Sequence, residues 1–217
     1  MAFLSLALVF VAIDRISVID HEIATWFHGH LTRPFIDLML ALSNGGSPLW
    51  IAAITLVAIL ILALRKRWYG LLALILTVPG GMLFHHLIQV IVHRHRPFRH
   101  SEFLDLGGYS FPSGHTMAAT LLYGLLAVFA ILVWKGWHWR ILAILGAILA
   151  IALVGFSRIA LGAHYLTDVL GAIVGGTSWL ILCMIVVEWT RRRRLVAEPE
   201  IKTTIEVSKP SDSHLIE

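Results

Sequence analysis

Three clusters of polar side chains interrupt an otherwise apolar chain, and their residue types suit the binding and transfer of a phosphoryl group. The clusters contain Arg96, then Pro112-Ser113-Gly114-His115, and last Ser157-Arg158 followed by His164 and Asp168. Arginine side chains and the free N–H groups of a helix N-terminus bind phosphate oxygens. A histidine paired with an aspartate is oriented and made more basic, as a nucleophile requires, and a second histidine can protonate a leaving alkoxide. The chemistry that these residues favour is phosphoryl transfer.

The spacing of the side chains predicts that they face one pocket. His164 and Asp168 are four residues apart and are expected on one helix face. Ser113 is expected to be the N-cap of the helix that follows it. Upstream of the first cluster, three polar residues recur at every fourth position: His85, Gln89 and His93. A polar stripe in a membrane span is costly unless it faces a cavity, so these side chains are expected to line the same pocket.

The elements that must position these residues are membrane helices. Of the 217 residues, 58% are hydrophobic and 14% are charged, and the mean hydropathy is +0.82, which excludes a soluble domain. Five charge-free stretches are each about as long as the 17 to 25 residues that a membrane-spanning helix needs. They cover residues 38–64, 68–92, 106–134, 141–157 and 169–187.

The first fifth of the chain predicts one short span followed by helices on the membrane surface. Residues 1–13 are apolar but would cover only about 20 Å as a helix, and a signal peptide or an upstream start are the alternatives to a short first span. Apolar and polar residues are interspersed through residues 19–42, which favours interfacial helices in the first outer loop. The predicted fold class is an all-α, polytopic membrane helical bundle with six transmembrane helices.

Basic residues predict the orientation of this bundle, because cytoplasmic loops collect Lys and Arg. Nine of them fall on one side: Arg65, Lys66, Arg67, Lys135, Arg140 and Arg191 to Arg194. Both termini are then cytoplasmic, and the polar clusters lie on the extracytoplasmic side of the inner (plasma) membrane. Residues 1–194 are predicted to form the transmembrane domain and 195–217 a disordered cytoplasmic tail. The net charge of +4 is explained by orientation and by lipid headgroups, so no nucleic-acid partner is expected.

In these clusters the sequence resembles the type 2 phosphatidic acid phosphatases. The signature of that family has three parts: Lys, six residues, Arg-Pro; then Pro-Ser-Gly-His; then Ser-Arg, five residues, His, three residues, Asp. The parts that match in order and spacing are Arg96-Pro97, 112–115, and Ser157-Arg158 with His164 and Asp168. The resemblance extends from roughly the first outer loop to the last span.

The resemblance implies a phosphatase that needs neither a metal nor another cofactor. In such an enzyme His164 attacks phosphorus to form a phosphohistidine, Asp168 holds the ring of His164, and His115 protonates the leaving oxygen. The resemblance further implies that four residues bind the phosphoryl oxygens: Arg96, Ser113, Gly114 and Arg158.

One position departs from the family pattern. The lysine of the first motif falls on Gln89, whose amide can donate hydrogen bonds but carries no charge. Gln89 is therefore predicted as a phosphate-binding residue with a weaker contact. Either His93, Arg94 or His95 supplies the missing positive charge, or the substrate preference differs from that of the family.

The sequence favours a lipid phosphate or diphosphate phosphatase. Its candidate substrates are phosphatidylglycerophosphate, phosphatidic acid, undecaprenyl diphosphate and lipid A phosphates. One alternative is a lipid phosphotransferase that uses the same site, and another is a lipid-binding or transport protein that has lost catalysis. A metal site is a further reading of the histidines at 85, 86, 93, 95 and 100, although no carboxylate or thiol accompanies them at the spacing of metal ligands. The sequence predicts no oligomeric state.

Overall fold

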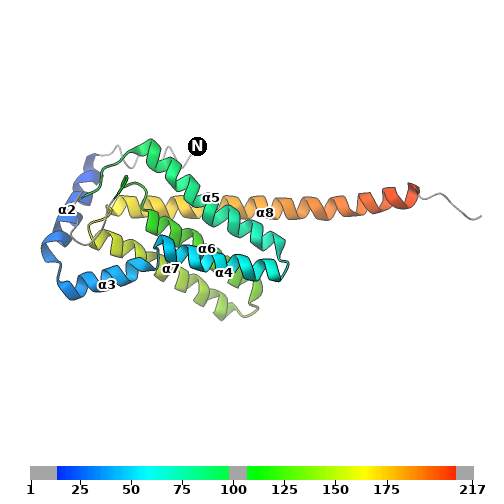
Figure 1. Cartoon of the computed structure of the whole chain (residues 1–217), viewed down its shortest axis with the longest axis horizontal. Coiled ribbons are helices and arrows are strands. Elements are labelled where there is room, and N and C mark those ends of the chain that lie inside the picture. The colour runs from blue at the N-terminus through cyan, green and yellow to red at the C-terminus, as the bar shows by residue number, and fades with distance from the viewer. Residues whose placement is uncertain (1–13, 98–106, 209–217) are drawn as a thin grey trace, which may run out of the picture.

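The computed structural model describes residues 14–97 and 107–208, and all regular structure in these ranges is helical (Figure 1). The helices are α2 (Asp14–His30), α3 (Arg33–Asn44), α4 (Pro48–Leu64), α5 (Trp68–Val92), α6 (Gly114–Val133), α7 (Trp137–Ala160) and α8 (Leu166–Ser208). The predicted all-α fold class is confirmed. The short first span predicted for residues 1–13 lies outside the described residues.

Five helical segments of the described chain are long and apolar enough to cross a membrane. They are Arg33–Leu64, Trp68–Val92, Gly114–Val133, Trp137–Ala160 and Leu166–Arg194. Each contains one of the five charge-free stretches identified in the sequence or most of it, as expected for a multi-pass membrane protein. Their outward side chains are apolar and exposed; Leu56, Leu149 and Leu182, for example, are each more than half exposed. Such side chains suit a lipid environment.

The break between α3 and α4 follows from a turn in the sequence. Ser47 is the N-cap of α4, and its Oγ accepts a hydrogen bond of 3.3 Å from the backbone N–H of Trp50. Pro48 occupies the first helical position, where its missing N–H costs nothing. α2 and α3 lie in the region of residues 19–42, for which helices were predicted, although α2 begins at Asp14, earlier than predicted.

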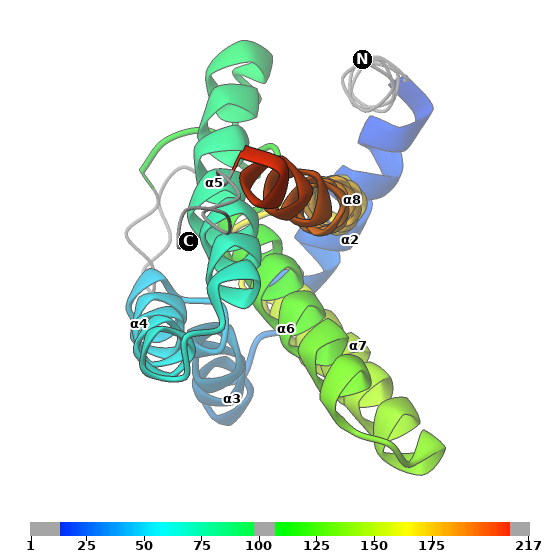
Figure 2. The same cartoon turned by 90° about the vertical axis from the view of Figure 1, so that its right-hand side faces the viewer.

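α6 is the central helix of the bundle. Figure 2 shows it between α5 and α7, and it also packs against α4 and α8. Its apolar side chains form the largest buried cluster together with residues of α5 and α8, among them Leu74, Met117, Leu121 and Ala172. A helix that is buried on most sides holds its N-terminus rigidly, and that terminus carries the Ser-Gly-His sequence of the second cluster.

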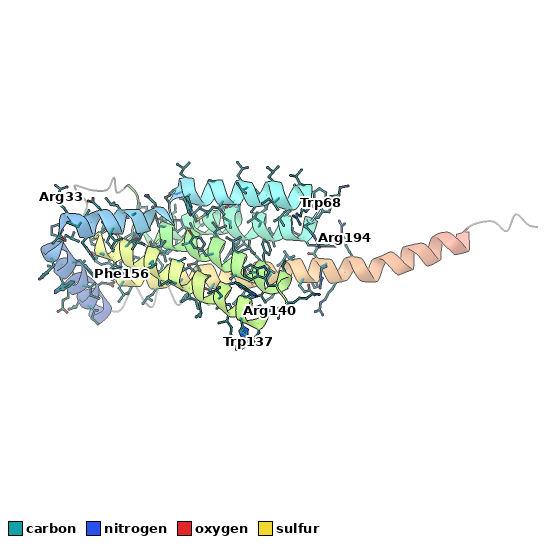
Figure 3. The ribbon with its side chains drawn as sticks, turned by 90° about the horizontal axis from the view of Figure 1, so that it is seen from below. Arg33, Trp68, Trp137, Arg140, Phe156 and Arg194 are labelled. Atoms are coloured by element: carbon teal, nitrogen blue, oxygen red, sulfur yellow. The ribbon has the colours of Figure 1, made fainter. Side chains whose placement is uncertain are left out.

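The basic residues predicted to be cytoplasmic lie toward one end of the bundle. Arg33 lies at one end, while Trp68 and Arg194 lie at the other, and Trp137 and Arg140 lie toward that second end (Figure 3). The loops or helix ends that carry the three polar clusters lie at the end of Arg33, near α2 and α3 (Figure 1).

The last helix is longer than the sequence predicts. α8 has 43 residues, a length of about 64 Å, and its backbone stays helical through Ser208. A disordered tail was expected from residue 195, but growth from an existing helix end requires no new nucleus, and Ala, Glu and Lys are favourable helix residues. Residues 209–217 lie outside the described residues, and the domain boundary at 194 stays a prediction.

Candidate active site

The three polar clusters meet at a cavity of about 700 Å³. Six of the eight predicted site residues line it: Gln89, Arg96, Gly114, His115, Arg158 and His164. The other two, Ser113 and Asp168, are fully buried directly beside lining residues. Residues far apart in the sequence are brought together because α5, α6, α7 and α8 all begin or end at this end of the bundle (Figure 1).

His164 lies in the turn between α7 and α8. α7 ends at Ala160, Gly162 adopts a positive φ of 67°, and α8 begins at Leu166. The expectation that His164 and Asp168 share a helix face is therefore wrong. Glycine adopts the left-handed conformation at little cost, and the turn that it permits returns the chain so that His164 Nδ1 lies 3.6 Å from Asp168 Oδ2.

The hydrogen bonds of His164 fix its tautomer. Its Nδ1 donates to the carbonyl oxygen of Ser110 at 2.8 Å. Its Nε2 lies 3.2 Å from Nη1 of Arg96, which can only donate, so Nε2 carries the lone pair. Burial lowers the pKa of the His164 imidazole below its usual value, although Asp168 opposes that shift. His164 is therefore a neutral imidazole near neutral pH, and it lines the cavity with the lone pair on Nε2.

Asp168 is an ionised carboxylate with a full set of donors. It accepts hydrogen bonds from the Ser110 hydroxyl, from the Tyr165 backbone N–H at 2.9 Å and from Arg94 Nη1 at 2.6 Å. It also lies in the first turn of α8, where the helix dipole favours a negative charge. The carboxylate is completely buried, and these donors together with the helix dipole compensate for the loss of water.

Arg94 has a structural position that the sequence did not predict. Its guanidinium donates to Asp168 at 2.6 Å, to Asp20 at 2.8 Å and to the Thr167 hydroxyl at 2.6 Å, and lies 4.4 Å above the centre of the Tyr165 ring. Burial alone would lower the pKa of this guanidinium, but Asp168 and Asp20 raise it above its usual value. Arg94 thus binds the Asp168 carboxylate and does not line the cavity.

The two arginines of the cavity are held by neutral oxygens. Arg158 Nη1 donates to Ser43 Oγ at 2.7 Å, and Arg96 donates to the carbonyl oxygens of Ala163 and Gly107 at 3.0 Å each. No carboxylate within the described residues forms an ion pair with either. The Nε atoms of both are buried and have no hydrogen-bond partner among the described residues. Two positive charges with unused donors can bind an anion.

His115 and Gly114 form the first turn of α6 beside these arginines. Ser113 is the N-cap of α6, as predicted, but its side chain makes no cap hydrogen bond; its hydroxyl instead accepts one of 3.0 Å from Thr116. The loop before α4 closes over this turn, because a Cβ on Gly46 would stand 2.6 Å from the His115 carbonyl oxygen. Only glycine permits that approach.

Gln89 lines the cavity, as predicted for the lysine position, and its amide Nε2 donates to the Tyr109 carbonyl at 3.1 Å. None of His93, Arg94 and His95 lines the cavity, so the expected substitute for the lysine charge is not found there. His93 ends α5 in the left-handed conformation, with its ring 4.4 Å from that of Tyr109, and so does not continue the predicted stripe.

Several further site residues were missed by sequence reasoning. His85 lines the cavity, as expected of the polar stripe, but its contact of 3.0 Å with the Pro112 carbonyl was not foreseen. Ser43, Ser110 and Asp20 belong to no recognisable sequence motif, and each binds a partner that is distant in the sequence. The alternative of a metal site at the histidines finds no support within residues 14–97 and 107–208, where no group of three or more His, Cys, Asp or Glu side chains could hold a metal ion; His100 lies outside those ranges.

The chain is similar to known membrane proteins over most of this structure. The profile of the PAP2 superfamily matches residues 67–192. Phosphatidylglycerophosphatase B of Bacillus subtilis (strain 168) is 38% identical over 112 residues, which are 49% of this chain and 52% of that protein. The chain thus aligns with about half the length of this curated relative.

A solved structure agrees over a longer range. It is described as the first transmembrane PAP2 type phosphatidylglycerolphosphate phosphatase from Bacillus subtilis, and it matches with a TM-score of 0.73 at 26% identity over 86% of this chain and 92% of that one. The profile match includes all three polar clusters and four of the five apolar segments. The chain belongs to the PAP2 superfamily.

Proposed function

We propose that the protein is a membrane lipid phosphatase that acts through a phosphohistidine on the extracytoplasmic face. One observation carries the proposal: the unprotonated Nε2 of His164 lies 3.2 Å from Arg96 in a cavity that Arg158 also lines, and the buried Nε donors of both arginines are unused. A phosphoryl group brings the negative oxygens that such donors require, together with an electrophilic phosphorus for the imidazole. The names of both relatives support a phosphatase.

In the first step the Nε2 lone pair of His164 attacks phosphorus, and the bond to the lipid oxygen breaks. His115 gives a proton to that oxygen, so the lipid leaves as an alcohol. Arg96 releases Nε2 and, with Arg158 and the N–H groups of Gly114 and the first turn of α6, binds the phosphoryl oxygens. Negative charge that develops on these oxygens is stabilised by donors that are already in place.

In the second step water attacks phosphorus and gives its proton to His115, the P–N bond breaks, and inorganic phosphate leaves. His164 regains its lone pair. Asp168 stays ionised throughout and stabilises the positive charge of the phosphorylated ring. Atoms and charges balance over the cycle, because the proton that His115 donates in the first step returns in the second.

The shape of the cavity supports a lipid substrate. From His115 and His164 it continues along apolar residues of α4 and α5, among them Ile51, Ile59 and Met82. Leu56 lines the cavity and is also 67% exposed on the outer surface of the bundle, so the cavity reaches the side that lipid would cover. A headgroup phosphate can enter while its chains remain in the bilayer. We propose phosphatidylglycerophosphate as the first substrate to test, because both relatives are named for it.

The test measures phosphate release by the full-length protein in detergent. Phosphatidylglycerophosphate, phosphatidic acid, undecaprenyl diphosphate and a lipid A phosphate are supplied separately, each with EDTA. We expect release from at least one lipid and loss of release in His164→Asn. When the lipid phosphate is labelled, protein that is quenched during turnover should carry labelled phosphate. This phosphate should be stable in alkali and lost in acid, as in a phosphohistidine. No release from any of the four lipids would overturn the proposal.

A further inference from the structure

α2 is fastened to the candidate active site through one buried carboxylate. Asp20 is 2% exposed, although most of its helix is open to the surroundings. Its Oδ1 accepts a hydrogen bond of 3.1 Å from the backbone N–H of Thr167. Its Oδ2 accepts hydrogen bonds from the Thr167 hydroxyl and, at 2.8 Å, from Arg94 Nη2. Backbone N–H groups at a helix start have no partner within the helix. Asp20 therefore caps α8 from another helix, within two residues of Asp168.

Arg94 is shared between this carboxylate and Asp168. One nitrogen contacts Asp168 and the other contacts Asp20, with the Tyr165 ring against the guanidinium plane. Buried charges are costly unless they are paired, and here two carboxylates surround one guanidinium. The group of three keeps one net negative charge, and the side of it nearest the cavity is Asp168, 3.6 Å from His164 Nδ1.

Without Asp20 the balance would change in two ways. Arg94 would neutralise Asp168 completely, and the first turn of α8 would lose a partner for its backbone and for the Thr167 hydroxyl. The carboxylate would then stabilise the positively charged ring of the phosphoenzyme less well. Asp20 does not line the cavity, so substrate contacts would stay as they are.

We propose that Asp20 is a positioning residue for the reaction: from α2 it holds Arg94 and the start of α8, and so fixes Asp168 and its net negative charge beside His164. This inference rests on the proposed phosphatase function. It assigns to α2 a role in catalysis in addition to its place on the bundle.

The experiment compares Asp20→Asn and Asp20→Glu with Asp37→Asn, which changes an exposed aspartate on α3. For Asp20→Asn we expect kcat to fall between about 10- and 100-fold, the range for a small misplacement of a reacting group. KM should stay within about twofold, because the substrate contacts are intact. Asp20→Glu keeps the charge but shifts the oxygens by one methylene, so a smaller loss in kcat is expected. Asp37→Asn should match the parent.

Thermal unfolding in the same detergent identifies variants that fail to fold. If Asp20→Asn is unfolded, Asp20→Glu decides alone: lower kcat at unchanged KM supports the inference, and parental kcat overturns it. A folded Asp20→Asn with parental kcat, or with a raised KM as its main change, also overturns the inference. Absence of phosphate release by the parent protein would instead refute the proposed function, so the two failures can be told apart.

Discussion

Both ring nitrogens of His164 are occupied before any substrate arrives. Nδ1 is bound to the Ser110 carbonyl and Nε2 faces Arg96, so the ring is held in one tautomer and one orientation. Holding a nucleophile in its reactive geometry lowers the entropy lost in the transition state. In the proposed mechanism the phosphoryl group takes Arg96 away from Nε2, which couples anion binding to the exposure of the lone pair.

The different roles of His115 and His164 can be separated by the leaving group. In the proposed mechanism His164→Ala removes the nucleophile and His115→Ala removes the acid, so each should reduce turnover of a lipid monoester by about 100-fold or more. A phosphate ester of a nitrophenol needs little protonation when it leaves. It should therefore restore part of the rate of His115→Ala and none of the rate of His164→Ala, measured by release of the phenol. Equal restoration in both variants would contradict the assignment.

Substitutions of Gln89 test whether this residue binds phosphate at the position of the family's lysine. Its amide is engaged by the Tyr109 carbonyl, and its side chain lines the cavity beside Arg96. In Gln89→Lys an ammonium can bind a phosphoryl oxygen, and a charge-assisted hydrogen bond is about twice as strong as a neutral one. We expect a KM for phosphatidylglycerophosphate lower by about tenfold or less. Gln89→Leu is the control that removes all polar contact, and it should raise KM. Unchanged kinetics in both would place Gln89 outside the phosphate site.

The residues that could be predicted from the sequence are those whose types carry the chemistry. Arg96, His115, Arg158 and His164 meet at one cavity, as their grouping in short motifs indicates. Asp20 could not be predicted, because its partner Thr167 is 147 positions away and an aspartate in an amphipathic helix is usually exposed. Its contacts depend on how α2 docks, which no local pattern encodes.

At the scale of elements, α8 and the loop before α6 are in close van der Waals contact, in addition to the hydrogen bond from Ser110 to Asp168. A Cβ on Gly171 would stand 2.4 Å from Cε2 of Phe111, a ring that is only 1% exposed. Phe111 lies between Ser110, which bonds Asp168 and His164, and Pro112, which bonds His85. Packing of α8 thus determines the position of the loop that orients the site.

Gly171→Ala should therefore damage both stability and activity. Overpacking of a well-packed interior costs about 1 to 3 kcal/mol, and movement of Phe111 would displace Ser110 from His164. Gly146→Ala is the matched control, because nothing lies within 4 Å of a Cβ there and alanine is the better helix residue. Thermal unfolding and phosphate release of both variants check the prediction. Parental values for Gly171→Ala would show that the loop does not depend on this contact.

The elements themselves were predictable where composition and turn chemistry act locally. The apolar runs indicated the membrane helices, and Ser47-Pro48 indicated the start of α4. The turn that carries His164 could not be predicted, because a spacing of four residues also fits a helix. Only Gly162 reveals the change of chain direction. The length of α8 was also missed, since composition alone does not show that a helix continues beyond its membrane part.

At the scale of the whole molecule, the charge difference between the two ends predicts which side of the membrane holds the site. In a Cys183→Ala background, Gly29→Cys places a thiol on α2 and Lys135→Cys places one between α6 and α7, both at exposed positions. We expect a membrane-impermeant maleimide to label Gly29→Cys in intact cells. Lys135→Cys should react only after the cells are opened. Labelling in the reverse pattern would place the cavity on the cytoplasmic face.

The lateral opening of the cavity near Leu56 has a consequence for the kinetics of the whole protein. A substrate that enters from the bilayer reaches the enzyme by lateral diffusion in two dimensions and not by diffusion through water. Its effective concentration is then its mole fraction among the surrounding lipids. Adding inert detergent at a constant amount of substrate and enzyme should therefore slow turnover by surface dilution. A water-soluble phosphate ester, which reaches the histidines from the aqueous side, should be turned over at the same rate throughout.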